Sequence, residues 1–403
     1  MSGEVSILFV VGSAIILAFL GGKVINKVRL PMVTGYVIVG VILGRSFFNI
    51  ITPDVVNRLN IFNDLALGII ALLIGGEFHL RRIRALGKDI VFISLLEAFG
   101  AFILVSSIAY LFTKELYTFL ILGAVASATA PAATVAVINQ YRAKGPLTTT
   151  ILGVVGSDDA IALMIFSFAS AIAFASIQHT PVSLNSAIIA PLKKIFLSIS
   201  LGGVVGYLLG ISLKRVRNRV EVFAVGIGSL LIVEGLAIQW DLSELLAVMA
   251  MGIVGANTSP LRRFSHLMDI INIAGFPIIA AFFCLAGTKL NVRLLPQIGF
   301  LGLAYTIARM AGKMGGAYIG ASIAKAPKFI RNSVGLGLFP QIGVAIAMAI
   351  VVEKRFSPLG ARGAHLANLV INILLFTTVI TEIVGPLLTK KALQKAGEIR
   401  KEF

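Results

Sequence analysis

Charged residues are scarce in this sequence of 403 residues. Asp, Glu, Lys and Arg together make up 13% of it and hydrophobic residues 58%, whereas a soluble domain carries about 25% charged residues. Apolar runs of about 20 residues recur along the whole chain, each long enough to cross a hydrocarbon core about 30 Å thick. The alternating apolar pattern of a membrane β-barrel is missing. We therefore predict an all-α polytopic membrane protein.

Cysteine and histidine are also few, which limits the cofactors that the chain could hold. A single cysteine, Cys284, allows no intramolecular disulfide and no metal site built from several thiolates. The four histidines show no ligand spacing: His79, His179, His266 and His365. We therefore expect no cofactor and no resident metal cluster.

Basic residues outnumber acidic ones, and the net charge is +17. Such a charge could indicate a nucleic-acid partner, but the basic residues lie in short loops between apolar runs, where Lys and Arg set the orientation of a membrane protein. About 23 of them lie on the side of the first loop and about 10 on the other. We therefore place the first loop and the C-terminus in the cytoplasm and the N-terminus outside, and expect no nucleic-acid partner.

This orientation requires an odd number of spans, and the apolar runs indicate about thirteen. The first should remain as a span, because the start Met-Ser-Gly-Glu lacks the basic region of a signal peptide. The approximate cores of the spans are residues 5–22, 31–48, 62–80, 89–112, 117–140, 147–177, 186–213, 221–238, 242–257, 264–287, 296–323, 331–353 and 363–388.

Two adjacent acids, Asp158 and Asp159, interrupt the apolar run GVVGSDDAIALMIFS. Charges inside a membrane are costly and normally paired, and Arg309 and Lys313 in the eleventh span are four apart and share one helix face. Adjacent helix positions project about 100° apart, so one acid could pair with Lys313 while the other binds an ion. The alternative is an Asp–Lys ion pair with the purely structural role of holding two helices together. The presence of two carboxylates and only one clear amine partner argues against it.

Two other spans carry the signs of broken helices. The fifth reads AVASATAPAATVAVINQ and the twelfth reads GLGLFPQIGVAIAMAI. Proline lacks an N–H group and clashes with the preceding turn, and a broken helix offers carbonyls and helix-end dipoles to ions within the membrane. The residues expected at the breaks are Ser127, Thr129, Ala130, Pro131, Pro340, Gln341 and Gly343. A simple proline kink is the alternative. With the seventh span as a linker, however, each six-span half has its break in its fifth span, which indicates an inverted repeat.

Four segments, in their order and spacing, resemble those of the monovalent cation:proton antiporter superfamily, and in particular its second branch of bacterial NapA-like sodium/proton antiporters. They are LPMVTGYVIVGVILG (30–44), LGIIALLIGGEFHLRRIR (67–84), GSDDAIALMIF (156–166) and ARMAGKMGGAYIGA (308–321). The resemblance covers nearly all of the chain. It implies two inverted six-helix repeats with crossed broken helices, a homodimer and an elevator-like movement.

The resemblance also implies a division of the single transmembrane unit into parts. An ion-transporting core, at about 89–177 and 296–388, would move against dimerisation or scaffold helices at about 5–80 and 221–287. The linker helix would be at about 186–213.

By the same resemblance, Asp159 is the aspartate that binds the ion and the proton in turn, and Asp158 is the aspartate that pairs with Lys313. Sodium would be held by Asp158 and Asp159, with help from Thr129 and Ser127 near the first break.

Two positions depart from the family pattern. Ala130 stands where some members have an acid, and Arg309 adds a second cation one turn before Lys313. Arg309 could replace Lys313 in the ion pair, or it could orient Glu97 or another buried acid. Otherwise we expect Glu97 and Glu382 to pair locally within the membrane.

These features predict a transporter of the cell inner membrane and not an enzyme. A buried carboxylate can hold a proton or a metal cation but not both, and this competition is sufficient for exchange. We predict exchange of cytoplasmic Na+ or Li+ for external protons, electrogenic if Lys313 carries a second proton. A K+/H+ antiporter stays open, because cavity size is not visible in a sequence. A sodium-coupled organic-anion symporter of the same fold would instead bind sodium through neutral polar residues.

Overall fold

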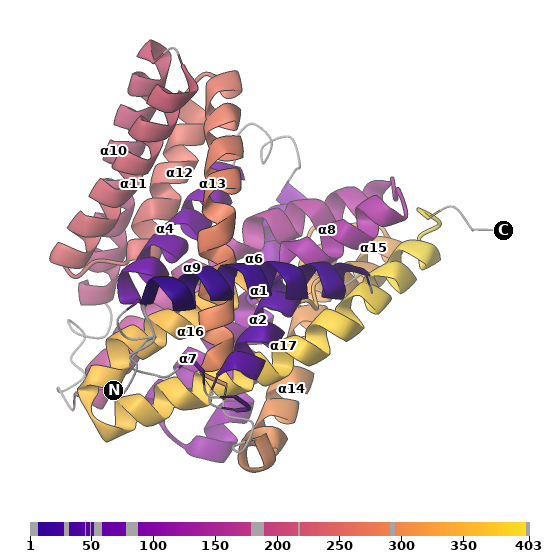
Figure 1. Cartoon of the computed structure of the whole chain (residues 1–403). Helices are drawn as coiled ribbons and strands as arrows, with labels where there is room; N and C mark the ends of the chain where they lie inside the picture. The colour runs from indigo at the N-terminus through magenta and orange to yellow at the C-terminus, as the bar shows by residue number, and fades with distance from the viewer. Residues whose placement is uncertain are drawn as a thin grey trace. The chain divides into compact units, whose positions relative to one another are not determined.

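The computed structural model describes residues 7–27, 32–44, 46–48, 50–51, 59–77, 88–178, 189–216, 218–290 and 295–399. Over these ranges the regular structure is helical and no strand is present (Figure 1). The prediction of an all-α fold is therefore confirmed. Residues 30, 31 and 78–84 of the first two family-like segments lie outside the described residues, as do His79 and His179.

The described residues form one helical segment for each of the expected spans. In chain order these are α1 (Ile7–Lys27), α2 (Met32–Leu43), α4 (Asn60–Glu77), α6 (Lys88–Thr113), α7 (Leu116–Ser127) with α8 (Pro131–Gln140), α9 (Pro146–Ile177), α10 (Ala190–Arg215), α11 (Arg219–Gln239), α12 (Glu244–Thr258), α13 (Leu261–Thr288), α14 (Leu295–Ile323), α15 (Lys328–Ser333) with η3 (Val334–Gly337) and α16 (Gly343–Phe356), and α17 (Ala361–Lys395). Within the described ranges, 7 helices are long and apolar enough to cross a membrane by length and composition: α1, α6, α9, α10, α11, α13 and α17.

The fifth and twelfth segments are interrupted, as the proline and glycine pattern predicts. Helix α7 ends at Ser127, and α8 begins at Pro131, where the missing N–H of proline costs no helical hydrogen bond. In the twelfth segment the helix ends at Gly337 and α16 begins at Gly343. The two breaks meet, because the Ala130 N–H donates to the Pro340 carbonyl at 2.8 Å. The side chain of Pro131 is not among those described.

The chain forms two compact units. The first comprises Met1–Thr52, Leu86–Thr180 and Phe283–Phe403, and the second comprises Pro53–Ala85 and Pro181–Phe282. Both ranges expected for the ion-transporting core, 89–177 and 296–388, fall in the first unit. Helices α1 and α2, which the resemblance assigns to the scaffold, also fall there.

Glycines line the contact between α6 and α14 in the first unit. Gly312, Gly316 and Gly320 recur every four residues along one face of α14. A Cβ atom on Gly316 would lie 2.0 Å from the Leu96 carbonyl oxygen, and one on Gly312 would lie 2.5 Å from that of Gly100. Small residues let helix backbones approach closely inside a membrane. We call this contact the glycine seam.

The C-terminal end of α17 is anchored to the start of α9. The Glu398 carboxylate accepts hydrogen bonds from the Leu147 and Thr148 N–H groups, each at 2.7 Å, and from the Thr148 hydroxyl at 2.6 Å. A carboxylate at a helix N-terminus satisfies free N–H groups and complements the helix dipole. This cap holds the helix that carries Asp158 and Asp159.

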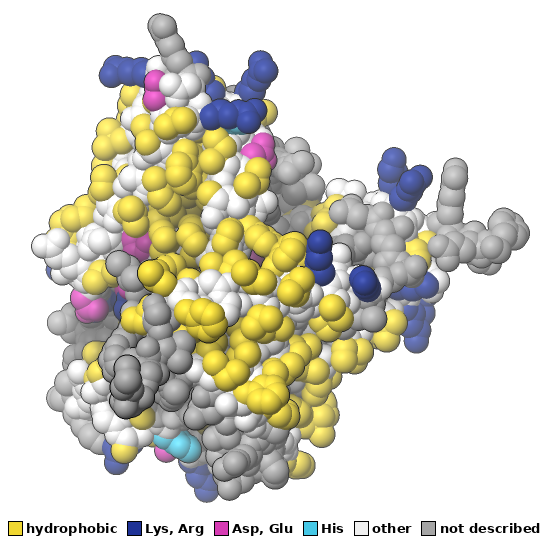
Figure 2. All heavy atoms as spheres, viewed as in Figure 1, with side chains coloured by type: hydrophobic (Ala, Val, Ile, Leu, Met, Phe, Trp, Pro, Cys, Tyr) yellow, Lys and Arg dark blue, Asp and Glu magenta, His cyan; other side chains and the backbone are white. Residues whose placement is uncertain are grey.

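The surface is rich in apolar side chains. Figure 2 shows hydrophobic side chains over much of the visible face, and Lys and Arg side chains mostly at its margins. Large apolar residues are widely exposed, for example Ile273 at 76%, Phe300 at 71% and Phe196 at 70%. Exposed apolar surface on this scale is rare in soluble monomers and suits contact with lipid.

Candidate ion-binding site

The ammonium group of Lys313 lies at the centre of the candidate site. Its Nζ atom is 2.6 Å from Glu97 Oε2 and 3.1 Å from Asp158 Oδ2. It also donates to the Thr129 hydroxyl at 2.8 Å and to the Ser127 carbonyl. Lys313, Glu97 and Asp158 are each 0% exposed. Four oxygens from α6, α9 and the first break thus surround one buried positive charge.

The glycine seam explains how Glu97 reaches this point. Gly312 and Gly316 flank Lys313 on α14, and a Cβ atom on Gly316 would lie 2.7 Å from the Glu97 Cα atom. The backbones therefore come close together beside the two charged side chains. The expected local pairing of Glu97 is confirmed, with Lys313 as its partner. Sequence reasoning did not identify this partner, although glycines four residues apart on either side of Lys313 were a signal for it.

The two adjacent aspartates occupy different positions around α9. Asp158 holds Lys313, while Asp159 follows it at about 100° around the helix and is 5% exposed. Asp158 Oδ1 is buried, and no hydrogen-bond donor from the described part of the chain reaches it. The structure therefore brings together Lys313, Asp158, Thr129 and Ser127 as the sequence suggested. Ser127 takes part through its carbonyl, because its hydroxyl donates to the Ala124 carbonyl at 2.6 Å.

Arg309 binds main-chain carbonyls at the crossing of the two breaks. Its guanidinium donates to Ala126 at 3.0 Å, to Ala128 at 2.7 Å and to Phe339 at 2.7 Å, with a longer contact to Pro340 at 3.5 Å. The planar five-donor group of arginine suits such a set of acceptors. Lys313, and not Arg309, forms the ion pairs with Asp158 and Glu97. The suggested pairing of Arg309 with either acid is therefore corrected.

Side chains of the second break fasten the crossing. The Gln341 amide donates to the Val125 carbonyl at 2.8 Å and to the Tyr305 hydroxyl at 3.1 Å, and the Thr378 hydroxyl donates to the Gln341 carbonyl at 2.9 Å. Gly343 begins α16, and a Cβ atom added to it would meet no heavy atom within 4 Å. Ala130 is buried, at 2% exposure, and takes part through its N–H.

Glu382 is a further buried acid of the same unit. It is 0% exposed, and neither of its carboxylate oxygens accepts a hydrogen bond from the described residues. The charge of Arg309 and the Gln341 backbone are close enough to act on it. Among the described residues, Glu382 therefore lacks the local ion-pair partner that we expected for it.

The ligands available in this site are oxygens. Among the described residues, no group of three or more His, Cys, Asp or Glu side chains could hold a metal ion. Carboxylate, hydroxyl and carbonyl oxygens are the ligands that hard cations prefer, and Asp158, Asp159, Thr129 and Ser127 supply all three kinds. Such a set suits a cation that is bound and released.

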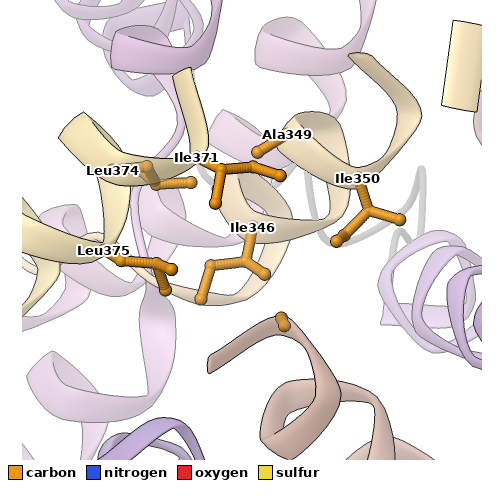
Figure 3. A pocket seen from close by; sticks show the side chains of 7 residues that line it. Ile346, Ala349, Ile350, Ile371, Leu374 and Leu375 are labelled. Atoms are coloured by element: carbon orange, nitrogen blue, oxygen red, sulfur yellow. The ribbon is translucent and has the colours of Figure 1, made fainter. Parts of the chain in front are cut away.

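A small apolar cavity lies elsewhere in the first unit. It has a volume of about 10 Å³ and lies between α13, α16 and α17 (Figure 3). Its lining consists of Ala286, Ile346, Ala349, Ile350, Ile371, Leu374 and Leu375. Apolar cavities of this kind stay dry, so it offers no ligand to an ion.

Known proteins are similar to this chain over almost its whole length. The family model described as sodium/hydrogen exchanger, transmembrane, matches residues 14–395. The ammonium/H+ antiporter subunit AmhT of Alkalihalophilus pseudofirmus is 23% identical over 378 residues, which cover 92% of each chain.

Solved structures of the sodium proton antiporter MjNhaP1 from Methanocaldococcus jannaschii share the fold at 17% sequence identity. The structure at pH 8 has a TM-score of 0.78 and covers 96% of this chain and 98% of that chain. The electron-microscopy map has a TM-score of 0.74 and covers 98% and 99%. This likeness confirms the predicted antiporter fold.

The match to the family model spans almost the entire chain, and the fold is that of a multi-pass membrane transporter. The chain belongs to the sodium/hydrogen exchanger family of cation/proton antiporters, and it is not an enzyme.

Proposed function

We propose that this protein exchanges cytoplasmic Na+ or Li+ for external protons, with Asp159 as the residue that binds the ion and the proton in turn. One observation carries the proposal. The ammonium group of Lys313 is fully buried and held by Asp158 beside the crossing of two broken helices. Charged residues inside a membrane are costly and mark ion pathways, and discontinuous helices form the ion sites of many transporters.

Competition for the carboxylates drives the proposed cycle. In the structure Asp158 is paired with Lys313. An arriving Na+ binds Asp159 and displaces its proton, because one carboxylate cannot hold both. Asp158 then exchanges Lys313 for the cation, helped by the Thr129 hydroxyl and the Ser127 carbonyl. When protons reload the site from outside, Na+ has left and the Asp158–Lys313 pair forms again.

We propose that access alternates by an elevator-like movement of the core helices within a homodimer, with scaffold helices at the dimer contact. Hydrogen bonds from Arg309 and Gln341 connect the two broken helices. These bonds support a movement in which both broken helices shift together. The positive-inside rule favours a cytoplasmic C-terminus and an external N-terminus.

The exchange is proposed to be electrogenic. Once Na+ has taken Asp158, the ammonium group of Lys313 faces a second positive charge in a low-dielectric site, where like charges repel strongly. Loss of its proton relieves this repulsion, and Lys313 then carries a second proton per cycle.

The identity of the cation is part of the proposal. The relative AmhT is named as an ammonium/H+ antiporter subunit, so ammonium belongs with K+ among the cations to compare. A sodium-coupled symporter would need a substrate cavity and sodium sites built from neutral polar residues. The fully buried Asp158–Lys313 pair supports the antiporter instead.

The test uses purified protein in liposomes with an internal pH dye and an imposed proton gradient. Addition of Na+ or Li+ should dissipate the gradient, and a potassium/valinomycin clamp should change the rate if net charge moves. Asp159→Asn should abolish the response and Asp158→Asn should reduce it strongly. Asp241→Asn is the matched control, because Asp241 pairs with Lys194 where both side chains are exposed. Wild-type exchange by the folded Asp159→Asn variant would refute the proposal.

A further inference from the structure

Glu97 is a buried carboxylate for which the proposed cycle has no role so far. It lies on α6, is 0% exposed and approaches Lys313 Nζ more closely than Asp158 does, at 2.6 Å against 3.1 Å. Its second oxygen, Oε1, is buried, and no hydrogen-bond donor from the described residues reaches it. A buried acid kept so incompletely satisfied is costly, so a role in holding helices together accounts for it poorly.

The oxygens around Lys313 Nζ form a cation site that an amine already fills. Glu97 Oε2, Asp158 Oδ2, the Thr129 hydroxyl and the Ser127 carbonyl all point at one positive group. These are the oxygen types that bind a hard cation, and two of the four belong to acidic side chains. Displacement of the ammonium group would make these oxygens available to a cation.

We propose that Glu97 is a direct ligand of the transported cation, which takes the position that the ammonium group of Lys313 occupies in the structure. The inference rests on the proposed antiport function and deepens it. Asp159 keeps its proposed role in the exchange of ion and proton, while Glu97 adds an acidic ligand from α6 beside Asp158 that sequence reasoning did not place in the site.

The surroundings of Glu97 favour the cation site over a purely structural ion pair. The other charged groups near it are Asp158, Lys313 and Arg309, and Arg309 is committed to carbonyls of the two breaks. The glycine seam fixes the α6 backbone at Leu96 and Glu97, so the carboxylate is presented from a rigid element. A preformed ligand on a rigid helix is what a selective ion site requires.

The experiment compares Glu97→Gln with wild type in two assays. Initial exchange rates in liposomes give KM for Na+, and the thermal stability of purified protein in detergent is measured with and without Na+, since a bound ligand stabilises the folded state. Loss of a residue that only supports a metal ligand typically weakens metal binding roughly 10–100-fold. Since Glu97 is proposed to bind the cation directly, we expect KM for Na+ to rise by at least that factor in Glu97→Gln. The increase in thermal stability on addition of Na+ should be smaller for Glu97→Gln than for wild type. Glu353→Gln, which breaks the ion pair of another glutamate with Lys289, is the matched control and should behave as wild type.

Glu97→Asp keeps the charge but withdraws it by one methylene group, so it tests the inference if Glu97→Gln fails to fold. It should retain exchange and change the relative KM values for Li+, Na+ and K+, because the size of the cage changes. A folded Glu97→Gln with wild-type KM and wild-type stabilisation by Na+ would overturn the inference, as would unchanged cation preference in Glu97→Asp. If the wild type itself responds to no cation, the proposed function fails; if the wild type exchanges and the Glu97 variants match it, the inference alone fails.

Discussion

The glycine seam makes a prediction about a single methyl group. Gly316→Ala would place a Cβ atom 2.0 Å from the Leu96 carbonyl oxygen and 2.7 Å from the Glu97 Cα atom. Backbone atoms cannot rotate away as a flexible side chain can, so α6 and α14 must separate. Gly315→Ala is the matched control, because Gly315 is its neighbour on α14 and a Cβ atom there meets nothing within 4 Å.

The separation can be estimated from these contacts. Real Cβ contacts almost never fall below 3.0 Å, so the two helices must move apart by about 1 Å, and forced overpacking of this kind costs about 1–3 kcal/mol of unfolding free energy. The better helix propensity of alanine returns up to about 1 kcal/mol. For Gly315→Ala only the propensity gain remains, so that variant should be as stable as wild type or slightly more stable.

The same movement should affect transport. A shift of about 1 Å at the seam lengthens the Glu97–Lys313 contact, now 2.6 Å, beyond hydrogen-bond distance. We expect Gly316→Ala to unfold at a lower temperature and to have a higher KM for Na+, measured by thermal unfolding in detergent and by exchange in liposomes. If Gly316→Ala matches Gly315→Ala in both assays, the close contact of α6 with α14 is not what positions Glu97.

Three further predictions concern other contacts of the first unit. Lys313→Met leaves Glu97 and Asp158 without their cation, which should lower the unfolding free energy by about 3–5 kcal/mol at neutral pH. Acidification supplies protons to the two carboxylates and should restore part of the thermal stability. A loss of stability that does not depend on pH would contradict the ion pairing. Arg309→Lys offers one ammonium group where a fork of donors binds several carbonyls, so at about 1–3 kcal/mol for each unsatisfied group it should lower the unfolding temperature and the exchange rate. Glu398→Gln removes a charged cap from the Leu147 and Thr148 N–H groups, so the first turn of α9 should lose about 0.5–2 kcal/mol and exchange its amide hydrogens faster. Glu115→Gln serves as its control, because Glu115 precedes α7 without a side-chain cap.

Much of the fold follows from local sequence. Apolar runs set the segments from α1 to α17, because a stretch that crosses lipid must satisfy its backbone as a helix. Proline and glycine mark both breaks, since Pro131 and Pro340 cannot donate a hydrogen bond and Gly337 and Gly343 bound the second break. The pairing of Asp158 with Lys313 was also within reach, because the cost of buried charge limits the possible partners.

The missed features depend on contacts between distant helices. Glu97 could be assigned to a span, but its place beside Lys313 depends on how closely α6 meets α14, which is set by glycines in two segments about 200 residues apart. The role of Arg309 was equally hidden, because its acceptors are carbonyls that only the crossing of the breaks exposes. A sequence shows the types of side chain, but it does not show which main-chain carbonyls remain without a hydrogen bond in the fold and could bind Arg309.

The most direct test of the account is proton release on cation binding. Purified protein in weakly buffered detergent, with a pH-sensitive dye, is mixed with NaCl and, as a control for salt, with choline chloride. The account predicts that Na+ and not choline releases protons from the wild type, and that Asp159→Asn releases fewer or none while Asp241→Asn behaves as wild type. Saturable Na+ binding to the wild type without any release of protons would contradict competition at Asp159, and with it the proposed exchange.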